Sequence, residues 1–133
     1  MSVKVEKLPD LPVIILTYEG HMDVETVKSA FIQSADIAAT IDGTVYRISD
    51  VRKGEGSFAD VINVIKAIRA SALGSSADPK IKGVFVGGHQ LARMYADFLK
   101  QEQFGSTAIP FFQTLEEALE FIRVDVQNMN TMS

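Results

Sequence analysis

The chain has 133 residues, of which 47% are hydrophobic and 23% are charged. This length allows one hydrophobic core, and this composition excludes a disordered chain of low hydrophobicity and high net charge. With 13 basic and 17 acidic residues the net charge is −4, so no broad basic surface is available for nucleic acid or anionic lipid, and we expect neither as a partner.

The sequence also indicates where the protein works. It contains no cysteine, which excludes disulfides, thiolate metal sites and cysteine nucleophiles. The N-terminal residues lack the apolar run of a signal peptide, and the apolar run Val13–Leu16 is far shorter than the roughly 20 residues that span a bilayer. We therefore expect a cytoplasmic protein without membrane insertion.

The first residues predict a hairpin that leads into a buried strand. Val3 and Val5 alternate with charged residues, as in an exposed strand, and residues 9–12 contain two prolines that mark a turn. Residues 13–18 form a nearly continuous β-branched and aromatic run, which predicts a strand buried on both faces near the centre of a sheet. Residues 19–23 are expected to break that strand.

The next predicted elements are a helix and another strand. Asp23 is a suitable N-cap, and the helix is expected to run to about Thr40. Its apolar face is formed by Val24, Val27, Phe31, Ala35 and Ala38. Asp42-Gly43 is a turn signal, residues 44–51 are rich in strand formers, and residues 52–56 are expected to form a loop.

The second half of the chain predicts further strand and helix pairs. Apolar residues recur at helical spacing after Ser57, and this helix is expected to end near Gly74. A short strand at residues 82–86 stops at Gly87-Gly88, and an aromatic-rich helix covers residues 91–99.

The last elements are a short strand and a capped helix. Residues 108–112 predict the strand, and Thr114 with Glu117 forms a capping box that opens the helix, which has Ile122 on its inner face. The polar residues from 125 onward are expected to fray, so we predict one domain over 1–126 and a flexible tail over 127–133.

The predicted order is therefore β-β-α-β-α-β-α-β-α in an α/β fold. Right-handed crossovers make the later strands parallel and place helices on both faces. We expect a mostly parallel five-stranded sheet with an antiparallel N-terminal edge strand.

This order resembles the STAS domain, the fold of bacterial anti-sigma-factor antagonists, and is most similar to its SpoIIAA-like branch. The similar stretches are residues 13–20, residues 46–51, and the run from Val84 through residues 112–122 with its Glu-Glu-Ala helix start. The resemblance implies a regulatory domain that acts through binding rather than turnover.

The resemblance also directs attention to Ser57. True antagonists present a phosphorylatable serine in an Asp-Ser-x-Gly context at the start of a helix. Here the segment reads Asp50-Val-Arg-Lys-Gly-Glu-Gly-Ser57-Phe58, which shares only a serine at a helix start. Ser57 is thus a candidate phosphorylation residue, and a plain N-cap role is the interpretation we favour.

Ligands of open parallel sheets bind beyond the carboxyl ends of the strands. The candidate ligand-binding residues at that edge are His21, Asp50, Arg52, Ser57 and His89. Two histidines with nearby aspartates raise the alternative of metal or acid-base chemistry, but no pair has the i, i+4 spacing of a helical metal site. We therefore predict no metal, no cofactor and no catalytic residue.

Two glycine-rich segments can each be interpreted either as part of a binding site or as a purely structural feature. Gly54, Gly56 and Ser57 have the composition of an anion-binding nest, whereas a flexible loop is the simpler interpretation. Gly87-Gly88 allows close approach of a ligand to the backbone, whereas a tight strand-to-helix turn explains it equally well.

Our functional hypothesis is a non-catalytic regulatory or ligand-binding module that binds a protein or a small ligand. The alternative is a small-molecule-binding protein or weak enzyme with a pocket at the carboxyl edge of the sheet. We also expect a homodimer, because an exposed edge strand pairs readily and twofold dimers are the commonest soluble oligomers.

Overall fold

The computed structural model describes residues 2–21, 24–55, 80–88 and 110–132. Its elements, in chain order, are β1 (Ser2–Lys7), β2 (Val13–His21), α1 (Val24–Ala38), β3 (Val45–Glu55), β4 (Ile81–Val86), β5 (Phe111–Phe112) and α4 (Leu115–Met132). The helices predicted over residues 57–74 and 91–99 lie outside the described residues, as do Asp23 and residues 108–109.

The strands form one five-stranded sheet in the order β1-β2-β3-β4-β5. β1 is antiparallel to β2, and the pairs β2–β3, β3–β4 and β4–β5 are parallel. The predicted fold class, with its antiparallel N-terminal edge strand, is therefore confirmed. β2 lies next to the central strand β3 and is buried on both faces, so the prediction of a buried strand near the centre over residues 13–18 is also confirmed.

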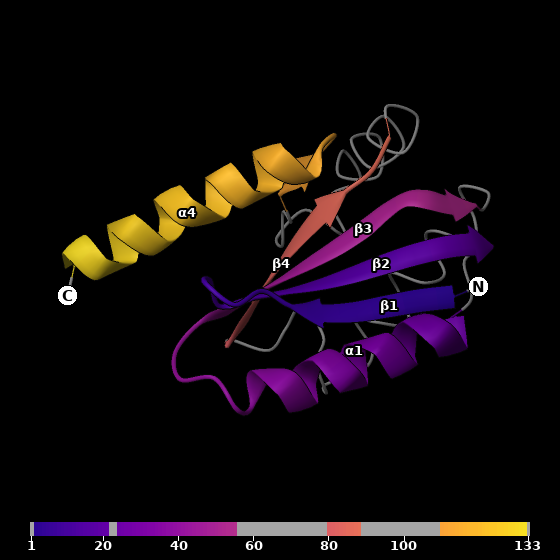
Figure 1. Ribbon diagram of the computed structural model, residues 1–133, viewed down its shortest axis with the longest axis horizontal. Coiled ribbons are helices and arrows are strands. Elements are labelled where there is room, and N and C mark those ends of the chain that lie inside the picture. The colour runs from indigo at the N-terminus through magenta and orange to yellow at the C-terminus, as the bar shows by residue number, and fades with distance from the viewer. Residues whose placement is uncertain (1, 22–23, 56–79, 89–109, 133) are drawn as a thin grey trace, which may run out of the picture.

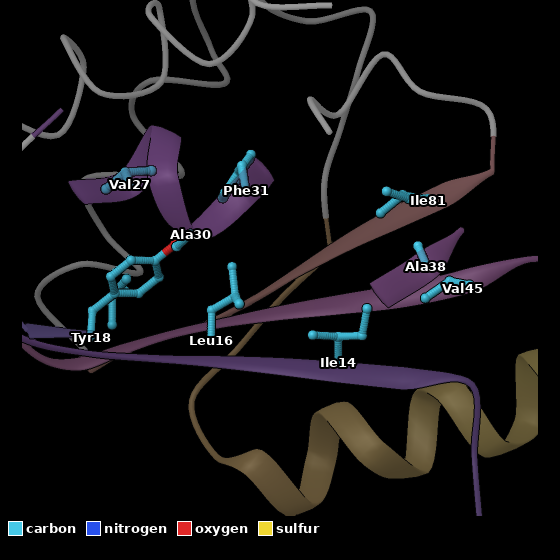
Figure 2. Packing of buried hydrophobic residues seen from close by; sticks show 10 residues of the cluster. Ile14, Leu16, Tyr18, Val27, Ala30, Phe31, Ala38, Val45 and Ile81 are labelled. Atoms are coloured by element: carbon cyan, nitrogen blue, oxygen red, sulfur yellow. The ribbon is translucent and has the colours of Figure 1, made fainter. Parts of the chain in front are cut away.

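The two helices of the described segments, α1 and α4, cover opposite faces of the sheet (Figure 1). Alternate residues of β2 point to opposite faces, so Ile14, Leu16 and Tyr18 pack with α1 (Figure 2). Val13 and Ile15 pack on the other face, together with Ile122 of α4. The predicted cover of helices on both faces is thus present.

Both central strands are longer than the sequence predicted. β2 continues to His21, so the expected break at residue 19 is wrong, and β3 continues to Glu55, so residues 52–55 are strand instead of loop. Backbone pairing explains both extensions, because Gly20 and His21 lie in register with Gly54 and Glu55. Gly20 has φ of 90°, a conformation that favours glycine.

α4 is also longer than expected, while its start is as predicted. The Glu117 N–H donates to Thr114 Oγ1 at 3.1 Å and the Thr114 hydroxyl donates to Glu117 Oε1 at 3.0 Å, which confirms the capping box. The helix continues through residues 125–132, which the sequence assigned to a frayed tail. The domain limit at 126 and the mobility of 127–133 stay predictions.

The extension of α4 has a tertiary cause. The Tyr46 hydroxyl of β3 donates to Asp125 Oδ2, and Lys82 Nζ of β4 donates to the same oxygen at 3.1 Å. Tyr46 also contacts Met129 Sδ at 3.4 Å, one helical turn further on. These contacts hold the last turns of α4 against the sheet. Neither α1 nor α4 is long and apolar enough to cross a membrane.

Candidate functional site

The carboxyl ends of the parallel strands meet at one edge of the sheet, where the sequence placed the candidate site. The ends of β2 and β3 bring four charged residues to this edge. Thr17 of β2 is in register with Asp50 of β3, and Glu19 is in register with Lys53. Because side chains alternate along a strand, residues 15, 17 and 19 of β2 face the α4 side of the sheet.

Asp50 and Arg52 form a tight ion pair at this edge. Arg52 Nε donates to Asp50 Oδ1 at 2.9 Å, and Arg52 Nη2 donates to Asp50 Oδ2 at 2.7 Å. The carboxylate is buried, with a side-chain exposure of 7%, whereas the arginine side chain is 43% exposed. The hydrogen bonds that Arg52 donates to Asp50 raise the pKa of Arg52. Asp50 therefore holds a permanent cation in place at the surface.

A β-bulge produces this arrangement. Between the pairs Thr17–Asp50 and Glu19–Lys53, β3 contains one more residue than β2, so Val51 and Arg52 together oppose a single residue. A bulge interrupts the hydrogen-bond ladder and leaves backbone groups to be satisfied otherwise. The Arg52 N–H donates to Asp50 Oδ1 at 3.1 Å, so the same carboxylate binds both the backbone and the side chain of Arg52.

A second ion pair lies next to the first. Lys53 Nζ is 3.5 Å from Glu19 Oε1, and these side chains are 73% and 55% exposed. Glu19, Arg52 and Lys53 are thus accessible charged side chains, and Arg52 is anchored on the buried Asp50. We call these four residues the polar patch.

His21 is not brought next to Asp50. It is the last residue of β2 and lies in register with Glu55, four residues beyond the register partner of Asp50. At the strand rise of about 3.3 Å per residue, this separation is roughly 13 Å along the strand. His21 is exposed at the same edge of the sheet.

The other predicted site residues lie partly outside the described residues, and the two glycine-rich segments differ in part from the prediction. Ser57 and His89 lie outside the described residues, so their place in a ligand site stays a prediction. Gly54 belongs to β3, which removes it from the proposed anion-binding nest. Gly88 has open space where a Cβ would lie and does not have positive φ, so neither packing nor conformation requires glycine there. Within the described segments, no group of three or more His, Asp or Glu side chains is placed to hold a metal ion.

A buried arginine in the same strand was not predicted from the sequence. Arg47 of β3 is only 2% exposed, and its guanidinium carbon lies 3.6 Å from the ring centroid of Phe31 on α1. Burial raises the pKa of the neighbouring Tyr18, and the positive charge of Arg47 opposes that shift. The signal that could have revealed the buried Arg47 is the presence of a charged residue inside a predicted strand.

Two comparisons with known proteins give no match, since neither a protein-family model nor a curated protein matches the sequence. A solved structure does match, and it is described as an anti-sigma factor antagonist from Mycobacterium paratuberculosis. The TM-score is 0.57, the sequence identity is 18%, and the match covers 92% of this chain and 93% of that one. The chain therefore has the fold that the resemblance to STAS domains implied.

Proposed function

We propose that this chain is a non-catalytic regulatory module that binds a protein partner through the polar patch. The observation that carries the proposal is the ion pair of Asp50 with Arg52. Both carboxylate oxygens accept hydrogen bonds from Arg52. Asp50 therefore supports a cation and is not free to act as a base or as a metal ligand. A held cation at a strand end suits recognition of an acidic surface.

The rigidity of Arg52 favours binding energetically. An arginine side chain loses rotamer entropy when a partner immobilises it, and that loss opposes association. The Asp50 carboxylate already restrains the Arg52 guanidinium, so this cost is largely met before the partner arrives. Arginine is enriched at protein interfaces, which fits the same role.

The name of the similar structure indicates the kind of partner. An antagonist of an anti-sigma factor acts on another regulatory protein, and the two chains share a fold over most of their length. We extend that class of partner to this chain. We also propose that it works in the cytoplasm, as a homodimer, and that Ser57 is an N-cap, with phosphorylation as the alternative.

A charge swap tests the proposal. The double variant Glu19→Lys/Lys53→Glu keeps the ion pair but exchanges the positions of its charges. The tagged chain is used as bait in its native cells, and a protein that it captures is purified. Titration calorimetry then measures the Kd of that protein for the wild type and for each variant. The swap is expected to weaken binding about tenfold or more, because like charges then face each other across the interface.

A matched swap serves as the control. Glu120 and Arg123 form an exposed ion pair on α4, with side-chain exposures of 69% and 55%. Exchanging these two residues is expected to leave the Kd unchanged. Equal binding by the polar-patch swap and the wild type would overturn the proposed surface, and a captured small ligand without any protein would favour the ligand-binding alternative.

A further inference from the structure

The outer edge of β1 presents backbone groups that pair with no strand of the described sheet. β1 is the terminal strand, and its inner side pairs with β2. In an antiparallel pair, the backbone groups of successive residues point alternately toward the partner strand and away from it. The Leu8 N–H donates to the Val13 carbonyl at 2.9 Å across the hairpin, so the backbone groups of the even-numbered residues of β1 point toward β2. The N–H and C=O groups of Val3, Val5 and Lys7 therefore point outward from the sheet.

The side chains of β1 carry a self-complementary charge pattern. Lys4 and Glu6 flank Val5 and lie on one face of the strand, with their charged atoms 3.6 Å apart. Val3 and Val5 lie on the other face and pack against the core beneath α1. The charge order reads positive then negative along the strand, so an antiparallel copy of the same strand presents the reverse order.

We propose that two copies of this chain pair through antiparallel β1 strands, related by a twofold axis at Val5. In this register the outward backbone groups of Val5 bond to those of Val5 in the second copy. Lys4 then lies directly opposite Glu6 of the second copy, and Glu6 opposite Lys4 of the second copy. Both are non-hydrogen-bonded positions, where facing side chains lie closest.

Charge excludes the two neighbouring symmetric registers. An axis at Lys4 places two lysines directly opposite each other, and an axis at Glu6 places two glutamates opposite each other. Like charges directly opposite destabilise a strand pair. Charged residues on an edge strand also discourage pairing with unrelated strands, so the same two residues select a second copy of this chain. The proposal is independent of the polar patch, whose residues it does not use.

Sedimentation velocity over a concentration series tests the pairing. The wild type is expected to reach about twice the 14.6 kDa mass of one chain. Lys4→Glu and Glu6→Lys each place like charges opposite each other, and each is expected to raise the dimer Kd about tenfold or more. Mixing the two variants restores opposite charges across the axis, so the mixture is expected to dimerise as the wild type does.

The mixture also controls for folding, because damaged chains would not reassociate. Lys4 and Glu6 side chains are 73% and 45% exposed, so the reversals are expected to leave the thermal melt unchanged. A wild-type mass of one chain at the highest soluble concentration would overturn the proposal. So would a dimer whose Kd responds to neither reversal.

Discussion

Asp50 and Arg52 show how two neighbouring residues create a surface feature that neither specifies alone. The carboxylate accepts the backbone N–H, Nε and Nη2 of Arg52, at a point where a bulge interrupts the ladder. Both residues were predicted candidates, but Asp50 was placed at the end of a strand and Arg52 in the loop that follows, with no pairing between them. Their pairing follows from the bulge in β3, which only the register with β2 reveals.

Arg52→Ala is expected to lower the free energy of unfolding by about 1–3 kcal/mol, because it leaves a buried carboxylate with fewer hydrogen bonds. Lys53→Ala removes the partner of an exposed glutamate and is expected to cost less than about 1 kcal/mol. Urea denaturation of both variants measures the difference. Equal losses would show that the Asp50 ion pair contributes no more than a surface pair.

Arg47 poses a different question at the residue scale. Its charge is buried between the sheet and α1, where the guanidinium lies over the ring of Phe31. Strand periodicity predicts which face a residue occupies but not how a buried charge is balanced.

α4 shows the limits of local reasoning at the element scale. Its start was predictable, because Thr114 and Glu117 form a motif of fixed spacing. Its end was not, because the Tyr46–Asp125 hydrogen bond joins residues that are 79 positions apart. The polar composition of residues 125–132 favoured a frayed tail, whereas the structure continues the helix there, next to contacts with β3 and β4.

Thr114→Ala is expected to destabilise the protein by about 0.5–2 kcal/mol, because the Glu117 N–H loses its acceptor at the helix start. Gln113→Ala alters the preceding exposed residue and is the matched control, with little change expected. Thermal denaturation followed by circular dichroism compares the two. If both variants melt alike, the capping box does not stabilise α4.

The contact of Asp125 with the sheet predicts a dependence of stability on pH. Hydrogen bonds from Tyr46 and Lys82 hold the pKa of Asp125 below its ordinary value. A carboxyl whose pKa is lower in the folded state stabilises the fold above its unfolded pKa of about 4, and loses this effect as the pH falls through the folded pKa. Acid is therefore expected to loosen the end of α4.

As the pH falls below about 4, the wild type is expected to lose free energy of unfolding, and the Asp125→Asn variant is expected to lose less of it. Burial, together with the hydrogen bond to Asp125, raises the pKa of Tyr46, so its hydroxyl remains a donor throughout this range. Tyr46→Phe keeps the ring and removes the donor, so it should raise the Asp125 pKa in an NMR titration. An unchanged Asp125 titration would contradict this account of the shift.

At the scale of the whole molecule, the fold was predictable and the site was only partly so. The alternation of helices with strands, the β1–β2 hairpin and the glycine turn at Gly43 all carry local signals in the sequence. The lengths of β2 and β3 do not, because pairing of Gly20 with Gly54 stabilises strand where composition favours loop. Ser57 and His89 stay predicted members of the site.

The central claim is that the protein acts by binding another protein through the polar patch. Native mass spectrometry of the tagged chain, isolated gently from its own cells, tests this most directly. The claim predicts a complex of the chain with a stoichiometric protein partner, which the Glu19→Lys/Lys53→Glu variant loses and the Glu120–Arg123 swap retains. A chain that carries only a small organic ligand, or a partner held equally by both swaps, would contradict it.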